Sequence, residues 1–222
     1  PEGLAAHGRG EAFDYLLGER TTPFARRAIR AASAALLSAS HPVISVNGNV
    51  AALVPSEIVK LAKVTGALLE VNLFHGSKTR ERKIANWLKK HGADRVYGIE
   101  PKFCVKIPEV QSNRRKVDCR GIKEADVVFV PLEDGDRTEA LRKLGKFVVA
   151  VDLNPLSRTA RKANITIVDN LVRAVPLMVE NVKYLSQSLG RRLDKMFRDF
   201  DNEANLEATL RFMLNRLESL SK

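Results

Sequence analysis

The chain has 222 residues, of which 45% are hydrophobic and 28% are charged. This is the composition of an ordinary globular protein, and no stretch reaches the roughly 18 to 20 uninterrupted apolar residues that a membrane helix needs. The only two cysteines form no CxxC pair, which argues against a disulfide scaffold or a structural metal site, and the net charge of +11 favours an anionic partner.

The basic residues are spread along the chain and are not interleaved with aromatic side chains, which make up only 6% of the residues. Because single-stranded nucleic acid stacks its bases on exposed aromatics, this distribution favours local phosphate sites over a nucleic-acid track. The start of the chain also lacks the basic, apolar and small-residue pattern of a signal peptide. We therefore expect a cytoplasmic protein that binds neither nucleic acid nor a membrane.

Two helices are expected before the first strand. Glu11–Leu17 and Pro23–Leu37 carry apolar residues at helical spacing, and Thr22 is the expected N-cap of the second helix. Ahead of them, residues 7–10 (His-Gly-Arg-Gly) predict a polar turn. Arg9 in that turn either reaches a bound anion or simply leads into a helix whose first residue is acidic.

From residue 41 onward, short β-branched runs alternate with helical periods, which predicts an α/β fold: a Rossmann-like parallel sheet with helices on both faces, plus N-terminal and C-terminal helices. The expected strands are Pro42–Val46, Ala67–Leu73, Arg95–Gly98, Ala125–Pro131, Phe147–Asp152 and Ile165–Val168. The expected helices are Val50–Val64, Arg80–Lys90, Arg137–Leu144, Arg158–Lys162, Leu171–Leu189 and Asn205–Leu220, the last capped by Asp201 or Asn202.

We expect one domain over residues 1–222. Within it we distinguish an N-terminal helical segment at 1–40, a basic insertion at 100–121 and a C-terminal helical segment at 190–222. The insertion is polar and interrupted by proline, and a loop of this length is usually functional or disordered.

Ligands of an open α/β sheet bind beyond the carboxyl ends of its strands, which directs attention to the loops there. The turn Asn47-Gly48-Asn49 is either an ordinary strand-to-helix turn with Asn49 as N-cap, or a ligand contact in which the glycine lets the backbone approach an anion. No Walker A or GxGxxG pattern occurs, which argues against a P-loop ATPase and a standard dinucleotide site.

A second group of polar residues follows two later strands. Asp152 and Asn154 either contact a ribose and a purine edge or cap a turn. Arg158 and Thr159 either hold a polyphosphate or form a solvated basic turn. Asn170 is either an N-cap or a further nucleotide contact.

Two more segments carry donors for an anion. His75 follows a strand and either contacts a phosphate, carries a proton or is structural. Residues 111–118, which include Arg114 and Arg115, either clamp the phosphate of a small acid or serve a solvated or subunit-interface role.

Four segments, taken in order and spacing, resemble the archaeal phosphopantothenate synthetases, also called 4-phosphopantoate–beta-alanine ligases. They are His7–Leu16, Asn47–Asn49, Gln111–Asp118 and Asp152–Thr159, and the resemblance spans nearly the whole chain. It implies a homodimeric ligase of coenzyme A biosynthesis that uses ATP and Mg²⁺. The carboxylate of 4-phosphopantoate would become an acyl adenylate, from which β-alanine displaces AMP to give 4'-phosphopantothenate.

The resemblance implies that ATP contacts Arg9, Asp152, Leu153, Asn154, Arg158, Thr159, Asn170 and Leu171. From chemistry alone we assign 4-phosphopantoate to Asn47, Gly48, Asn49, His75, Arg114 and Arg115. No residue is expected to act as a covalent nucleophile or as a metal ligand, because the substrates' own carboxylate and amine attack. Relatives are expected to carry a further segment with a basic nucleotide contact ahead of Pro1, and a basic side chain where this chain has Gly76.

Three alternatives remain open on sequence alone. The first is a non-catalytic module that binds a nucleotide or nucleic acid, and the second is an oxidoreductase that uses a dinucleotide. The third is a ligase that forms an acyl phosphate and releases ADP. The sequence does not separate AMP from ADP release, and it does not indicate metal ligands or regulation.

Overall fold

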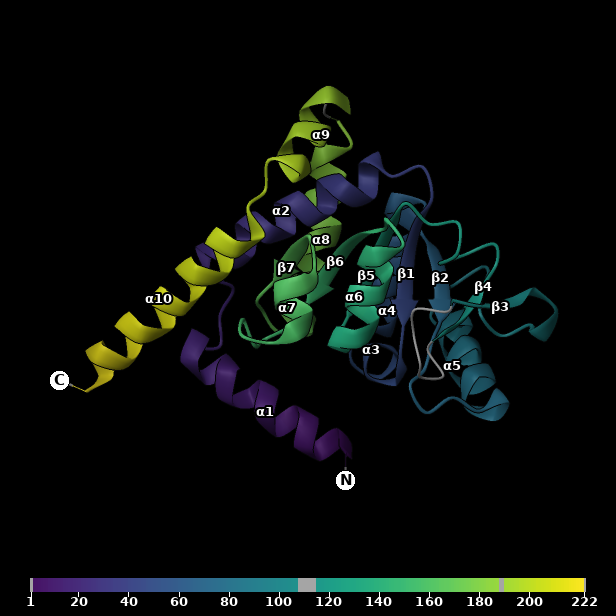
Figure 1. The fold of residues 1–222 in the computed structure, drawn as a ribbon, viewed down its shortest axis with the longest axis horizontal. Coiled ribbons are helices and arrows are strands. Elements are labelled where there is room, and N and C mark those ends of the chain that lie inside the picture. The colour runs from purple at the N-terminus through teal and green to yellow at the C-terminus, as the bar shows by residue number, and fades with distance from the viewer. Residues whose placement is uncertain (1, 108–114, 188–189, 222) are drawn as a thin grey trace.

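The computed structural model describes residues 2–107, 115–187 and 190–221, and at its centre lies a five-stranded parallel sheet in the order β2-β1-β5-β6-β7 (Figure 1). The strands are β1 (Pro42–Val46), β2 (Leu68–Val71), β5 (Val127–Pro131), β6 (Phe147–Val151) and β7 (Ile165–Ile167). The chain runs from β1 outward to β2 and then crosses to β5 on the other side of β1. The predicted α/β class is confirmed, and the sheet is doubly wound with a topological switch point between β1 and β5.

The strands are buried on both faces because their residues alternate between two cores. Phe129 faces a large core that also takes in α2 (Pro23–Ser38), α4 (Pro55–Thr65), α5 (Lys78–Lys90) and α8 (Leu171–Leu185). Its neighbours Val128 and Val130 face a smaller core with α6 (Gly135–Lys143). This burial explains the continuous apolar runs from which the strands were predicted.

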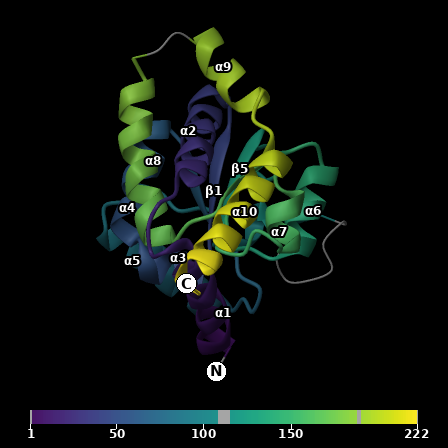
Figure 2. The same ribbon diagram turned by 90° about the vertical axis from the view of Figure 1, so that its left-hand side faces the viewer.

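The remaining helices lie around the ends of the sheet. They are α1 (Glu2–Leu17), α3 (Gly48–Leu53), α7 (Arg158–Lys162), α9 (Gly190–Arg198) and α10 (Asn202–Leu220). Leu17, Ala160 and Leu206 form a third cluster that joins α1, α7 and α10. Figure 2 shows α8 and α10 on either side of α2. No helix among the described residues has the length and apolar content needed to cross a bilayer.

Several helix ends follow the predicted capping chemistry. The Thr22 hydroxyl accepts a hydrogen bond of 3.1 Å from the backbone N–H of Ala25, and Pro23 fills the first position of α2. Asp201 caps α10 by accepting from the backbone N–H of Ala204 at 2.9 Å. Both predicted caps are confirmed.

Three predicted elements are wrong in detail. The helix expected over residues 50–64 is two helices, because Pro55 lacks an N–H and begins α4 as a separate element after Val54. The strand expected at 95–98 is a single bridge between Tyr97 and Glu70. The polar turn expected at residues 7–10 is part of α1, which begins at Glu2.

The insertion and the C-terminal region also differ from expectation. The insertion contains a short 3₁₀ helix, η1 (Pro101–Phe103), and an antiparallel pair, β3 (Cys104–Lys106) and β4 (Lys116–Asp118), where only an irregular loop was predicted. The helix expected over residues 171–189 ends at Leu185, and a separate helix, α9, follows. Arg114 lies outside the described residues.

Candidate active site

The side chain of Asn47 joins the loops that follow β1 and β5 at the switch point. Asn47 accepts hydrogen bonds from the backbone N–H groups of Asn49 and Val50 and so caps α3. Its amide nitrogen donates to the carbonyl oxygens of Pro131, at 3.2 Å, and Leu132, at 3.0 Å. The N-cap is therefore Asn47, and the predicted cap Asn49 is an exposed residue of the first turn.

A basic side chain lies against the turn after β1. The guanidinium of Arg80, from the first turn of α5, is 2.9 Å from the place that a Cβ atom on Gly48 would occupy. Arg80 also donates to the carbonyl oxygen of His75 at 3.4 Å, which joins the loops after β1 and β2. Glycine at position 48 thus allows a cation to lie close to the start of α3, and the sequence reading missed Arg80.

His75 itself is exposed, and its ring meets the ring of Phe74 edge to face at 4.7 Å between centroids. The structure places it near the predicted turn at residues 47–49 through the shared contact with Arg80. Arg115, which begins the segment leading into β4, is exposed and pairs through its backbone with Ile107. Neither side chain is buried.

Arg137 is the most unusual residue of the switch point, because it is 0% exposed. Its Nη1 donates to the side-chain oxygen of Asn72, which follows β2, and to Glu133 at 3.1 Å, which follows β5. Since β2 and β5 flank β1, the guanidinium spans the carboxyl end of β1. Burial lowers the pKa of Arg137 to about 10, a shift that Glu70 and Asp134 oppose, so the residue stays protonated at neutral pH.

The sequence reading missed Arg137, although one signal was available. A cation in the first turn of a helix faces the positive end of the helix dipole, so its presence there calls for a compensating reason. Arg137 occupies that position in α6, which Asp134 caps.

A buried carboxylate fastens the insertion to the sheet. Glu70 on β2 is fully buried and accepts hydrogen bonds from the backbone N–H groups of Asp118, at 2.9 Å, and Ile122, at 2.7 Å. Burial raises the pKa of Glu70 to about 7, although these two bonds and Arg137 act in the other direction. A Cβ atom on Gly121 would come within 2.1 Å of the carboxylate, which explains the glycine.

A second set of contacts supports the same insertion. Asn72 donates to the carbonyl oxygen of Lys116 at 2.7 Å. Arg120 donates to Asp118 through Nε and Nη2, and to Glu100 at 3.2 Å. Burial would raise the pKa of Asp118, but the bonds from Arg120 outweigh it and hold that pKa below its ordinary value. The start of β4 is therefore fixed beside the carboxyl end of β2.

On the other side of the switch point, the loop after β6 forms a turn. Asp152 accepts from the backbone N–H of Asn154, at 2.9 Å, and from the hydroxyl of Ser157, and Asn154 accepts from the N–H of Leu156 at 2.9 Å. Burial raises the pKa of Asp152, opposed by these bonds. Asp152 and Asn154 therefore cap a turn, as one of the two predictions for them stated. Their contact with a nucleotide remains a prediction.

Arg158 and Thr159 connect this turn to the switch point. The Thr159 hydroxyl is buried and donates to the carbonyl oxygen of Glu133 at 2.9 Å. Arg158 pairs with Asp136 and lies across the start of α6, close enough to Gly135 that a Cβ atom there would collide with it. The predicted nucleotide loop and the loop after β5 therefore lie in contact.

Asn170 caps α8, accepting from the backbone N–H of Val172 at 3.2 Å, and it donates to Asp14 of α1 at 2.9 Å. Arg173 also pairs with Asp14, so α1 is tied to the start of α8. The next residue, Leu171, is buried in the core.

The same helix α1 reaches the loop after β6. Gly10 approaches Leu153 so closely that a Cβ atom added there would lie 3.4 Å from its side chain. The backbone of Arg9, one residue earlier in α1, is thereby brought beside the predicted nucleotide loop. The structure thus gathers the predicted ATP residues on the β6 and β7 side, and the predicted substrate residues that it describes on the β1 and β2 side.

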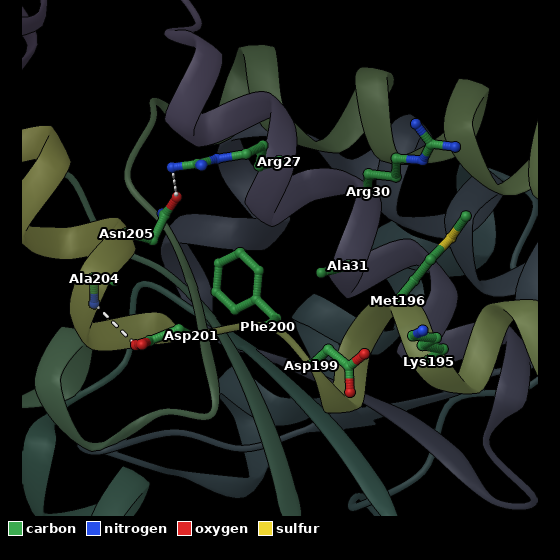
Figure 3. Close-up of a pocket in the computed structure, with 10 residues that line it drawn as sticks. All are labelled: Arg27, Arg30, Ala31, Lys195, Met196, Asp199, Phe200, Asp201, Ala204 and Asn205. Atoms are coloured by element: carbon green, nitrogen blue, oxygen red, sulfur yellow. Dashed lines mark hydrogen bonds between the residues drawn. The ribbon is translucent and has the colours of Figure 1, made fainter.

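A cavity of about 590 Å³ lies elsewhere, between α2, α9 and the start of α10 (Figure 3). It is lined by Arg27, Arg30, Ala31, Lys195, Met196, Asp199, Phe200, Asp201, Ala204 and Asn205. Figure 3 shows Arg27 turned toward Asn205, to which it donates a hydrogen bond of 3.3 Å. The lining includes none of the predicted site residues, and α9 lies at the opposite end of the sheet from α3 (Figure 1).

The sheet order defines a doubly wound α/β protein, and the cationic side chains of Arg80, Arg137 and Arg158 lie around its switch point. The chain matches the model of the phosphopantothenate/pantothenate synthetase family over residues 24–216 and belongs to that family.

Relatives from three archaea align with almost the full length of this chain. The chain is 55% identical to the 4-phosphopantoate–beta-alanine ligase of Thermococcus kodakarensis over 221 residues, which cover 99% of this chain and 84% of that protein. It is 52% identical to the protein of that name from Thermococcus onnurineus, with the same coverage. The Methanosarcina mazei protein of that name is 49% identical, with 99% and 86% covered.

Proposed function

We propose that the chain joins 4-phosphopantoate to β-alanine, forming 4'-phosphopantothenate while ATP is split to AMP and diphosphate. The observation that carries the proposal is the identity of 49% to 55% over 99% of the chain with proteins named for this ligation. At the coarser level the chain is a carbon–nitrogen ligase of coenzyme A biosynthesis. The dependence on ATP and the adenylate route are the proposed part, and we propose that residues 1–222 act as one domain.

In the proposed reaction a carboxylate oxygen of 4-phosphopantoate attacks the α-phosphorus of ATP and diphosphate leaves. The amine of β-alanine then attacks the acyl carbon, AMP leaves with the electron pair of the broken C–O bond, and the amine loses its proton to solvent. The protein's task is to align three reactants and to offset the repulsion between two anions.

ATP is proposed to lie beyond β6 and β7. Asp152 and Asn154 would face the nucleoside, Arg158 and Thr159 the phosphates, and Leu153, Asn170 and Leu171 the neighbouring loop edge. Arg9 would approach from α1. Support comes from the single edge of the sheet that these segments share and from the contact of Thr159 with the loop after β5.

4-Phosphopantoate is proposed to lie beyond β1 and β2, against Asn47, Gly48, Asn49, His75, Arg114 and Arg115. Arg80 joins this set because its guanidinium lies over Gly48. This arrangement brings the substrate carboxylate toward the switch point, where the α-phosphate of ATP approaches from the other side.

Mg²⁺ is proposed to arrive bound to the triphosphate. Within residues 2–107, 115–187 and 190–221, no group of three or more histidine, cysteine, aspartate or glutamate side chains is placed to hold a metal ion. Magnesium in nucleotide sites commonly keeps several waters and binds substrate phosphates, so a protein cage is not needed. Its contribution would be to reduce the negative charge that the attacking carboxylate meets.

A homodimer is also proposed, and exposed leucines on α10 offer a surface for it. Leu214, Leu217 and Leu220 are 56%, 48% and 67% exposed, and they lie at helical spacing on a helix that extends away from the sheet (Figure 1). Large apolar side chains gathered in this way commonly mark a protein interface.

The direct experiment mixes purified protein with ATP, Mg²⁺, 4-phosphopantoate and β-alanine and identifies the products by mass spectrometry. AMP together with the amide supports the whole proposal. ADP with the amide keeps the ligase and replaces the adenylate by an acyl phosphate. Absence of amide, combined with salt-dependent binding of generic RNA or DNA, would favour the non-catalytic binding module.

A further inference from the structure

The buried guanidinium of Arg137 has one edge in use and one edge without a partner. Its Nη1 serves Asn72 and Glu133, while neither Nε nor Nη2 has a hydrogen-bond partner among the residues that the structure describes. Buried polar groups in native proteins are nearly always satisfied, and an unsatisfied charged donor is especially costly. Such an edge therefore calls for a specific explanation.

The geometry of that edge limits what it can bind. The N–H bonds of Nε and Nη2 run parallel, and together they match the two oxygens of a planar carboxylate. The charges around it limit the ligand further. Glu133 pairs with Arg137 at 3.1 Å, and Glu70 and Asp134 interact with it electrostatically. Because these acidic groups already lie beside the guanidinium, they repel a singly charged carboxylate less than they repel a phosphate dianion.

The location of Arg137 points to one reactant of the proposed ligation. Through Asn72 it contacts the β2 side, where 4-phosphopantoate is placed, and through Glu133 it contacts the loop that accepts from Thr159 on the ATP side. A group bound beside Arg137 would therefore be near both proposed binding regions. In the proposed arrangement this is the place left for the third reactant, the amine nucleophile.

We infer that Arg137 binds the carboxylate of β-alanine through its Nε and Nη2 edge and so positions the amine for attack. This inference rests on the proposed function. A carboxylate held by both oxygens is a poor nucleophile, which suits the carboxylate of β-alanine because it does not react. It does not suit the carboxylate of 4-phosphopantoate, which must attack ATP. The edge is fully buried in this structure, so the amino acid could reach it only if neighbouring side chains moved.

The first test varies β-alanine at saturating ATP and 4-phosphopantoate in Arg137→Lys, which keeps the charge but loses the paired donors. The KM for β-alanine should rise about tenfold to a hundredfold, the loss of one charge-assisted pair of bonds, while the KM values for ATP and 4-phosphopantoate stay the same. Arg142→Lys, an exposed residue on the same helix, is the matched control and should behave like the wild type. Equal changes in all three KM values would overturn the inference.

The second test removes the carboxylate from the substrate instead. Wild-type protein should use β-alaninamide far less efficiently than β-alanine, and Arg137→Lys should discriminate much less between the two amines. Exchange of labelled diphosphate into ATP, driven by 4-phosphopantoate without an amine, should proceed equally in both proteins. Unchanged discrimination in Arg137→Lys would show that another group reads the carboxylate.

Thermal unfolding of each variant would show whether a change in kinetics comes from loss of the fold. If Arg137→Lys does not fold, Arg137→Gln provides the second variant, because its neutral amide removes both the charge and the paired donors. It should raise the KM for β-alanine and leave diphosphate exchange intact, and an unaltered KM would contradict the inference. Wild-type protein that forms no amide would instead refute the proposed function.

Discussion

At the scale of single residues, Glu70 gives the clearest dependence on pH. Its pKa is raised to about 7 in the folded protein from an ordinary value of 4.5, so the folded state binds this proton more tightly than the unfolded state. The associated stability is fully present below pH 4.5 and is lost as the pH rises through 7. The loss amounts to about 3 kcal/mol.

Glu70→Gln should remove this dependence. The free energy of unfolding of the variant, measured by urea denaturation and compared with that of the wild type, should increase by about 3 kcal/mol between pH 4.5 and pH 8. The exposed Glu180→Gln is the control and should show no such trend. A constant difference across the pH range would mean that Glu70 titrates normally despite its burial.

Substitutions of Arg158 and Arg115 test the proposed ATP region and the proposed 4-phosphopantoate region separately. Arg158→Ala should raise the KM for ATP by about tenfold through loss of a phosphate contact, and Arg115→Ala should raise the KM for 4-phosphopantoate by a similar factor. Both side chains are exposed, so the fold should be retained, as far-UV circular dichroism would show. Steady-state kinetics with each substrate varied in turn provides the measurement, and a reversed pattern would exchange the two assignments.

At the scale of elements, the loops after β1 and β5 are joined by Asn47. Asn47→Ala should lower the free energy of unfolding by about 2 to 3 kcal/mol, because it removes an N-cap and leaves two carbonyl oxygens without their donor. Chemical denaturation would measure it, with Asn49→Ala as the control, since Asn49 is exposed and is not the cap. Equal effects of the two substitutions would restore Asn49 as the capping residue.

The elements also show how far the sequence could lead. The five core strands were predictable because each is an apolar run buried on both faces, and the site loops followed from the rule that ligands bind beyond the carboxyl ends of strands. The pair β3 and β4 was not predictable from pattern. Each has three residues, and the insertion is held by Glu70 and Asn72, which are distant in the sequence.

Arg137 was missed for the same reason. Arg137 and Asn72 are 65 positions apart, and only the fold brings them together and removes them from water. A charged residue read from the sequence is expected to be solvated, so no local pattern predicts its burial. The break between α3 and α4 could have been predicted, because Pro55 marks it in the sequence. It was missed because apolar residues continue at helical spacing on both sides of Pro55.

At the scale of the whole molecule, the exposed leucines of α10 carry the prediction on assembly. Light scattering coupled to size-exclusion chromatography should find a dimer for the wild type and a monomer for Leu214→Glu combined with Leu217→Glu. Replacing the exposed Glu207 by Gln on the same helix should leave the dimer intact. A double variant that remains dimeric would place the interface elsewhere.

The strand order has a consequence for how the chain folds. The pairing of Val43 in β1 with Val128 in β5 joins strands that are far apart in the chain, whereas the pairings of β5 with β6 and of β6 with β7 join strands that follow each other closely. Closing the long loop to β1 costs chain entropy before any contact repays it. We therefore expect β5, β6 and β7 to form the folding nucleus. In denaturant-dependent folding kinetics, Val149→Ala should slow folding while Val43→Ala mainly accelerates unfolding. The junction of β1 and β5, beside which the proposed chemistry takes place, would then be the last part of the sheet to form.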